Sequence, residues 1–216
     1  MKHVRTPLLG WIGSCLVLCF SCQSPQTDKN RGQLPETGES LPAVSDPLIA
    51  KIVSDPGVLR IKAGQSAGIL QLKMPSDSVF HLLGSADSTA AAMCKDLSAW
   101  HSESARLRIY SLCDNDLDMR KSVQVLAVCG VPFETAEGIT AQSSLPEIRQ
   151  HYPGTRLLGQ IAPNAQSGYL AGDTTRGIAF ALSDTTAAGR IQCVLIHLPG
   201  KSVTSTNIPF YPDLKM

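Results

Sequence analysis

The sequence predicts an α+β protein made of two tandem units, each a short helical portion packed on an antiparallel β-meander. Two short amphipathic segments, residues 74–84 and 143–153, predict the helices, and a glycine or proline ends each of them. Pairs of apolar runs joined by turns follow both segments, and the whole pattern recurs after roughly 70 residues. Because helices and an antiparallel sheet can bury apolar residues against each other, this succession indicates the α+β class.

The composition is that of a globular protein without affinity for nucleic acid. The chain has 216 residues, of which 43% are hydrophobic, and a disordered chain would contain fewer large aliphatic residues. The formal net charge is +1, whereas a nucleic-acid-binding protein needs clustered Lys and Arg to displace counterions from phosphate. We therefore expect no nucleic-acid partner.

The N-terminus has the features of a secretory signal peptide. Lys2 and Arg5 precede residues 7–20, an uncharged, largely apolar run that is shorter than the roughly 20 residues needed to span a bilayer. Ser21–Cys22 resembles the end of a bacterial lipobox, in which the cysteine is lipidated and becomes the mature N-terminus. We predict a lipoprotein signal peptide at residues 1–21 and a membrane attachment through the lipid on Cys22.

Two alternatives stay open at this end of the chain. Phe20 stands where a lipobox normally has a small residue, and residues 12–15 fit its letters better, although lipidation of Cys15 would leave an apolar mature end. The other alternative is cleavage of a plain signal peptide.

Residues 22–46 are rich in Pro, Gly, Ser, Thr and Gln, so we expect them to form a disordered tether. No acidic run follows Cys22, and we expect the tethered domain to face the periplasm.

Spacing and capping residues justify the two helices. In the first segment Val79, Leu82 and Leu83 stand at i, i+3 and i+4, the spacing of one helical face, and the second segment repeats this stripe. Ser144 and Glu147 form the sequence pattern of a capping box, which satisfies two backbone N–H groups at the start of a helix.

The strand predictions follow the helices in chain order. The main pairs are 107–112 with 122–128 and 178–182 with 190–196, and further strands are expected at 58–62, 67–72, 91–94, 98–101, 156–161 and 168–171. Turns at 114–121 and 184–189 join the two main pairs. The first unit then covers residues 47–130, and the second covers residues 131–216 with a C-terminal tail.

A family resemblance rests on turn and core residues. The motif residues are Gly138-Ile139, Ser143-Ser144, Glu147-Ile148 and Tyr152-Pro153. This succession resembles small bacterial envelope lipoproteins of the outer-membrane assembly (SmpA/OmlA) type and the repeats of beta-lactamase inhibitor protein. The first unit matches through residues 76–79 and 82–84 but lacks the glycine usually found just before the helix. The resemblance covers most of residues 58–198; it implies helices on one face of an antiparallel sheet and binding to other proteins, and it carries over no binding residue.

Four cysteines belong to the predicted folded part: Cys94, Cys113, Cys129 and Cys193. They form no CxxC pair, which argues against a zinc ribbon and a thioredoxin-like site. In an oxidising envelope one or two disulfides are expected. Cys113 and Cys129 lie at opposite ends of the predicted hairpin and should not pair, and we choose Cys94–Cys129. The alternative is that all four are small buried thiols.

No pattern in the chain indicates a catalytic, cofactor or metal site. The four histidines of the mature chain, His81, His101, His151 and His197, are far apart and form no metal-binding pair. His197 alternates with apolar residues, so we expect it in the core. The alternate aspartates at 114, 116 and 118 lack the glycine and glutamate of a calcium loop and indicate a charged hairpin tip. Residues 172–177 are expected to form a turn rather than an anion site.

Two aromatic residues are the candidates for an interface. Trp100 and Tyr110 lie near the first hairpin and could anchor a partner, with core packing as the alternative. The apolar tail at 207–216 could dock on the sheet or be a peptide ligand.

The leading functional interpretation is a non-enzymatic, membrane-tethered envelope lipoprotein. One face of its sheet is expected to be covered by helices, leaving the other free to bind an envelope protein or peptide. The alternative is a small-ligand-binding or envelope-stress-sensing lipoprotein, which a deep pocket between the units would favour. An enzyme would require His101 to meet a cysteine or an aspartate in a cleft.

Overall fold

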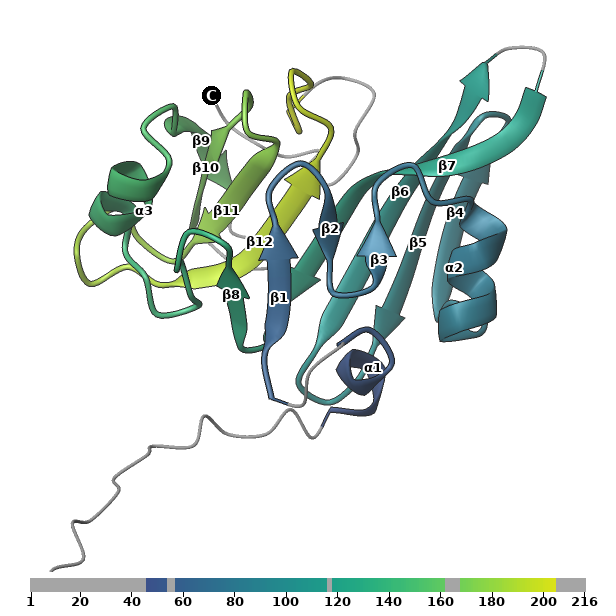
Figure 1. The fold of residues 1–216 in the computed structure, drawn as a ribbon, viewed down its shortest axis with the longest axis horizontal. Helices are drawn as coiled ribbons and strands as arrows, with labels where there is room; N and C mark the ends of the chain where they lie inside the picture. The colour runs from purple at the N-terminus through teal and green to yellow at the C-terminus, as the bar shows by residue number, and fades with distance from the viewer. Residues whose placement is uncertain (1–45, 54–56, 116–117, 162–167, 205–216) are drawn as a thin grey trace, which may run out of the picture. The chain divides into compact units, whose positions relative to one another are not determined.

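The computed structural model describes residues 46–53, 57–115, 118–161 and 168–204. The predicted signal peptide, Cys15, Cys22, the tether up to residue 45 and the tail at 207–216 lie outside the described residues. The structure has a large antiparallel sheet of eight strands in the order β4-β5-β6-β7-β12-β11-β10-β9 and a smaller four-stranded sheet, β3-β2-β1-β8, which lies in front of the large sheet in Figure 1. The α+β class is confirmed.

The elements have the following bounds: α1 Pro47–Ala50, β1 Leu59–Lys62, β2 Ser66–Ala67, β3 Leu70–Gln71, α2 Ser76–Leu83, β4 Ser88–Ala92, β5 Lys95–His101, β6 Arg106–Asn115, β7 Asp118–Cys129, β8 Phe133–Thr135, α3 Leu145–His151, β9 Arg156–Ile161, β10 Gly168–Asp173, β11 Ile178–Leu182 and β12 Ile191–His197. Each of α2 and α3 is followed by four strands of the large sheet, β4–β7 and β9–β12, and β8 of the small sheet lies between the two series. The last strands of the two series, β7 and β12, pair antiparallel in the middle of the large sheet.

Three strand and turn predictions are wrong: two predicted strands contain turn residues, and one predicted turn contains strand residues. The predicted strand 67–72 is split into β2 and β3 by Gly68, whose φ is +56° and where a Cβ atom would lie 1.9 Å from the carbonyl oxygen of Ile52. The predicted strand 91–94 ends early, since Cys94 lies in the two-residue turn between β4 and β5. The turn expected at 114–121 is shorter, because β6 and β7 continue pairing to Asn115 and Asp118.

The two predicted helices are confirmed, and their ends differ. The capping box of α3 is present: the Glu147 carboxylate accepts a hydrogen bond from the backbone N–H of Ser144 at 2.6 Å. At α2 the N-cap is Pro75, which has no side chain that could accept such a bond. Val79, Leu83 and Ile148 are at most 3% exposed, but Leu82, which the predicted stripe of the first helix included, is 42% exposed.

One face of the large sheet, here called the front face, carries the main core. Its buried side chains include Leu107, Leu126, Phe180 and Val194, and they form one apolar cluster with residues of α1, α2, α3 and the small sheet. In Figure 1 the two longer helices lie near opposite ends of the large sheet. Since the cluster contains residues of both predicted units, these units share one core.

The opposite face, here called the back face, is buried as well. Tyr110, Val125, Ala127, Ala179 and Leu195 point to it and are at most 1% exposed. The expectation of a free sheet face that binds a partner is therefore wrong. A binding surface has to be sought at the ends of the strands.

Candidate functional site

A groove of about 800 Å³ opens at one end of the central strands. Four chain segments far apart in sequence form its walls: the connection between β5 and β6, the connection between β7 and β8, residues 140–142, and the start of β12. Its lining residues are Val58, His101, Ser102, Glu103, Ser104, Ala105, Arg106, Cys129, Gly130, Val131, Pro132, Phe133, Glu134, Thr140, Ala141, Gln142, Ile191 and Gln192. The volume is within the range of typical ligand pockets, about 300–1,000 Å³.

The lining combines an apolar inner part with a polar rim. Ala105, Val131, Phe133 and Ile191 are between 3% and 6% exposed, so they contribute a largely apolar interior. The exposed side chains include those of His101, Glu103, Arg106 and Gln142. This arrangement suits a ligand that has an apolar part and polar or charged groups at its ends.

A glycine permits the close approach of two walls. Gly130 has a φ of +76°, and a Cβ atom at this position would lie 2.1 Å from the carbonyl oxygen of Ser104. Any other residue would push the connection after β7 away from the connection between β5 and β6. The run from Gly130 to Phe133 after a strand was the sequence signal for this wall, and our strand predictions did not include it.

A disulfide joins the two central strands beside the groove. Cys129 of β7 is bonded to Cys193 of β12, and Cys94 is bonded to Cys113. The predicted Cys94–Cys129 pairing is wrong, because each cysteine is bonded to the cysteine that lies opposite it in the sheet. Cys193 is the register partner of Cys129, and Cys113 donates its backbone N–H to the carbonyl of Cys94 at 3.0 Å. Strand pairing fixed the bonds, and the sequence had not shown that β7 and β12 are neighbours.

The last residue of the predicted tether is fixed to the groove wall. The Asp46 side chain is the N-cap of α1, accepting the backbone N–H of Leu48 at 2.9 Å and that of Ile49 at 3.2 Å. Its other oxygen accepts the hydroxyl groups of Ser102 and, at 2.6 Å, Ser104, both of which line the groove. Asp46 therefore belongs to the folded domain, and the chain enters the domain at the groove.

These contacts also set the ionisation of the Asp46 carboxyl. Burial would raise its pKa, but the hydrogen bonds from Ser102, Ser104 and the backbone of α1 together lower the pKa below 3.8. The carboxylate is thus the form that holds the chain at the groove at neutral pH.

His101 lies at the groove rim with an aspartate nearby. Its Nδ1 is 3.6 Å from Asp87 Oδ2, and its backbone N–H donates to the same oxygen at 2.6 Å. Both side chains are about half exposed, at 46% and 57%. The carboxylate is already engaged with the backbone, so it fixes the position of His101 at the end of β5.

Trp100 and Tyr110 do not form an interface. Trp100 is 4% exposed, donates its indole N–H to the Gly84 carbonyl at 3.1 Å and packs against Phe80 in a tilted arrangement with ring centroids 5.5 Å apart. Tyr110 is 1% exposed, and burial raises its pKa. Of the two possibilities that the sequence offered, core packing is therefore the one observed, because alternation along β5 and β6 points the two rings to opposite faces of the sheet, both of which are buried.

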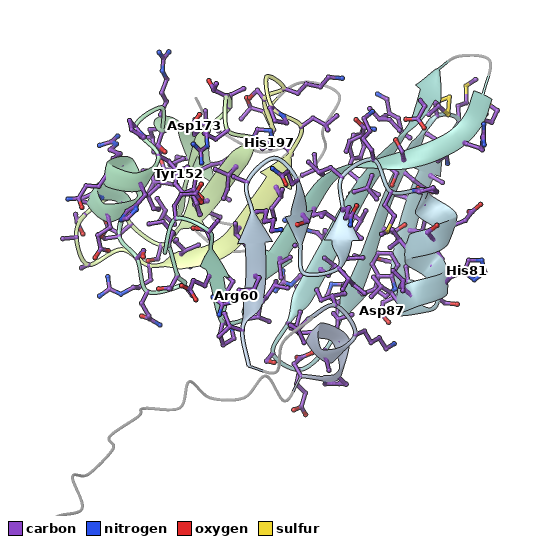
Figure 2. All side chains as sticks on the ribbon, in the orientation of Figure 1. Arg60, His81, Asp87, Tyr152, Asp173 and His197 are labelled. Carbon is purple, nitrogen blue, oxygen red and sulfur yellow. A yellow bond between two sulfur atoms is a disulfide. The ribbon has the colours of Figure 1, made fainter. Side chains whose placement is uncertain are left out.

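The other histidines of the described residues do not line the groove. Figure 2 shows His81 on the outer side of α2, and His151 is exposed at the end of α3. His197 is 2% exposed, and its burial lowers its pKa, so the prediction of a core histidine is confirmed. In the described parts of the chain no group of three or more His, Cys, Asp or Glu side chains could hold a metal ion.

The two polar loops that the sequence left open are turns. Asp173 is buried and accepts the backbone N–H groups of Thr175 at 3.0 Å and Arg176 at 3.1 Å, which closes the turn between β10 and β11. Asp114 lies near the tip of the β6–β7 hairpin and accepts the Ser122 hydroxyl. Asp116 lies outside the described residues.

Tyr152, Glu137 and Arg176 form a polar cluster at the end of α3. The Tyr152 hydroxyl donates to the Glu137 carboxylate, which also pairs with Arg176. Burial and the Glu137 carboxylate both raise the pKa of Tyr152 well above its usual range. The hydroxyl therefore stays protonated and keeps its hydrogen bond at physiological pH.

Comparison of the chain with family models, with curated proteins and with solved structures found no match. Across the described ranges, no helix has the length and apolar character needed to cross a membrane. The functional reading consequently depends on the sequence features and on the groove.

Proposed function

We propose that the protein is a non-enzymatic lipoprotein of the cell envelope, anchored through a lipid on Cys22, that binds a protein or peptide segment in the groove. The observation that carries this proposal is the groove itself, with the tether ending on its wall at Asp46. An apolar interior of about 800 Å³ with charged groups at the rim suits a short apolar segment flanked by polar residues.

The attachment at Asp46 supports a role at a membrane. A tether of about 24 residues in a flexible chain has an average end-to-end distance of some 25–30 Å, so the lipid would keep the groove close to its membrane. A partner in or near the same membrane would then meet the groove at a high effective concentration.

Tandem repetition is the finer part of the proposal. Two features support it: α2 and α3 are each followed by four strands of the large sheet, and the last strands of the two series pair in the centre. The likeness to envelope lipoproteins and to beta-lactamase inhibitor protein agrees with protein binding. In an experimentally determined structure, residues 76–129 and 145–197 should superpose element by element, and halves that differ in strand direction would contradict the repeat.

A small apolar ligand is the second candidate, because the groove volume also suits a compact molecule. Organic extraction of the purified protein followed by mass spectrometry separates the two candidates. A single small compound recovered in equal molar amount would favour the second candidate.

The main test is mass spectrometry of proteins that co-purify with the tagged full-length protein from detergent-solubilised envelopes. Gln142→Trp adds a large side chain at an exposed lining position, and Ala188→Trp, in the exposed β11–β12 turn, is the matched control. We expect one envelope protein in near-equal amount with the wild type and with Ala188→Trp, and its loss with Gln142→Trp. Recovery that is the same for all three proteins would contradict binding in the groove.

A Cys22→Ser variant tests the anchor in the same preparation. The wild type should be found in the membrane fraction and the variant in the soluble fraction. Equal distribution of the wild type between the two fractions would contradict lipid attachment.

A further inference from the structure

The outer edge of β4 is open along its whole length. β4 is the first strand in the order of the large sheet, and within the described ranges only β5 pairs with it. All five residues of β4, Ser88–Ala92, are exposed. In an edge strand, about half of the backbone N–H and C=O groups point away from the sheet, where they can pair with another extended chain.

β4 has none of the features that normally prevent strand pairing at a sheet edge. These features are charged side chains, prolines, bulges and very short strands. The side chains of β4 are one Ser, one Thr and three Ala, and all five residues pair with β5 in an unbroken register. Five residues is also an ordinary length for a strand, so β4 can accept a further strand beside it.

The other described sheet edges are protected. At the opposite side of the large sheet, β9 begins with Arg156 and has a bulge at Leu158, where its register with β10 shifts. In the small sheet, β3 has only two residues, and β8 is bridged on its outer side to Thr140. This difference distinguishes β4 as the edge that is open to an additional strand.

The side chains beside this edge favour a partner with large apolar residues. Ala90 lies opposite Leu97 of β5, and Leu97 lies opposite Tyr110 of β6, so the three residues form one row on the back face. Tyr110 is buried, whereas Leu97 is partly exposed and has only the methyl group of Ala90 on its outer side. A large apolar side chain in register with Ala90 would extend over this methyl group and cover Leu97.

A second copy of this chain would not provide such a side chain. If two β4 strands paired antiparallel about Ala90, alanine would face alanine, and Leu97 would stay partly exposed. The pairing would also involve only the five residues of each β4, whereas a stable interface has about 20–30 residues on each side. These two arguments favour a strand from a different protein.

We propose that β4 binds an extended segment of another protein, which adds to the large sheet as a ninth strand and places a large β-branched or aromatic residue beside Ala90. Hydrogen bonds between the two main chains give the affinity, and the alternate side chains of the segment give the specificity. No residue of β4 lines the groove, so this surface is separate from the groove and does not depend on its function.

A random peptide display library, selected on the full-length protein, provides the probe. We expect the enriched peptides to have large apolar residues at alternate positions. One enriched peptide is then synthesised, and amide hydrogen exchange is measured with and without it. Exchange in β4 should slow by about 10-fold or more in the complex, while exchange in β9 should not change. Failure to enrich any peptide, or unchanged exchange in β4, would overturn the proposal.

Point variants locate the binding of this peptide. Ala90→Lys puts a charge on an exposed edge position and should weaken binding by about 10-fold or more. Ala188→Lys, in the exposed β11–β12 turn, is the matched control, and it should bind like the wild type, as should the groove variant Gln142→Trp. Equal binding by Ala90→Lys and the wild type would contradict the proposal, and so would loss of binding in Gln142→Trp or dimerisation of the chain through β4.

N-methylation of the peptide tests whether its main chain pairs with β4. A strand uses the N–H groups of alternate residues on each of its two sides. Of two peptides methylated at the odd or at the even positions, one should therefore keep its affinity and the other should lose it. Equal affinities of the two methylated peptides would overturn strand addition.

Discussion

The two ends of the large sheet differ in how they are held. At the β9–β12 end, every residue of β11 is buried, and the Phe180 and Tyr152 rings pack with centroids 5.9 Å apart. At the β4–β7 end, every residue of β4 is exposed, and a disulfide ties the β4–β5 turn to β6. β11 and β12 are stabilised by packing on both faces, whereas the exposed edge strand β4 depends on its pairing with β5 and on the disulfide beside it. Stability should therefore decrease from β11 and β12 toward β4.

The largest expected effect is the removal of a buried ring at the packed end. Phe180 is fully buried, and Phe180→Ala should lower the free energy of unfolding by about 3–5 kcal/mol, since the cavity is enclosed on the front face. Phe80, partly exposed on α2, is the matched ring at the other end, and Phe80→Ala should cost about 2 kcal/mol. Urea unfolding measures both. Equal losses would contradict the difference between the two ends.

The two disulfides sharpen the same comparison. Cys129–Cys193 closes a loop with a sequence separation of 64, and Cys94–Cys113 closes one of 19. From loop entropy, removing the first with paired serines should lower the free energy of unfolding by about 4 kcal/mol, and removing the second by about 3 kcal/mol. Thermal and urea unfolding of the two double variants would measure the order. A larger loss for Cys94→Ser/Cys113→Ser would show that the exposed end limits stability.

Asp46 provides a pH-dependent contact near the groove. Asp46→Ala should lower the free energy of unfolding by about 2 kcal/mol, because α1 loses its N-cap and two serine hydroxyls lose an acceptor. Its pKa is lowered in the folded state, so the contribution is present above pH 3.8 and is lost as the pH falls through the folded pKa.

Unfolding of the wild type and of Asp46→Asn between about pH 6 and pH 2 would follow this loss. The stabilities of the two proteins should converge at the acidic end. A difference that does not change with pH would show that Asp46 acts without its charge.

Tyr152 gives the smallest effect and the opposite pH dependence. Tyr152→Phe should lower the free energy of unfolding by about 1–2 kcal/mol, because the substitution removes the hydroxyl and its hydrogen bond to Glu137. The folded-state pKa is raised, so this contribution is fully present below pH 10 and decreases as the pH rises toward the folded value. Unfolding measured at pH 8 and above pH 10 should show the advantage of the wild type shrinking. Glu137→Gln should reduce the pH dependence, and an unchanged slope would contradict this cause.

Features set by neighbouring residues were predicted from the sequence, and features set by contacts between distant residues were missed. The burial of Val79 and Leu83 and the capping box at Ser144 and Glu147 are set by neighbours within one or two turns, and both were predicted correctly, whereas Leu82 is exposed. The split of residues 67–72 was missed, although Gly68 was visible, because only the close carbonyl of Ile52 makes the turn necessary. The Cys129–Cys193 pairing was missed because it follows the pairing of β7 with β12, which brings together residues 64 positions apart, and Cys94–Cys113 follows the register of β5 on β6.

The sequence by itself determined the α+β class, the two helices, most strand positions and the burial of His197. These features arise from the period of apolar residues and from capping, which act over short distances. Only the tertiary structure decided which strands are neighbours, that both sheet faces are buried, and that four distant segments enclose a groove with Asp46 on its wall. The physical reason is that strand order and close packing depend on contacts between residues far apart in the chain, and apolar spacing along one segment carries no information about its partner.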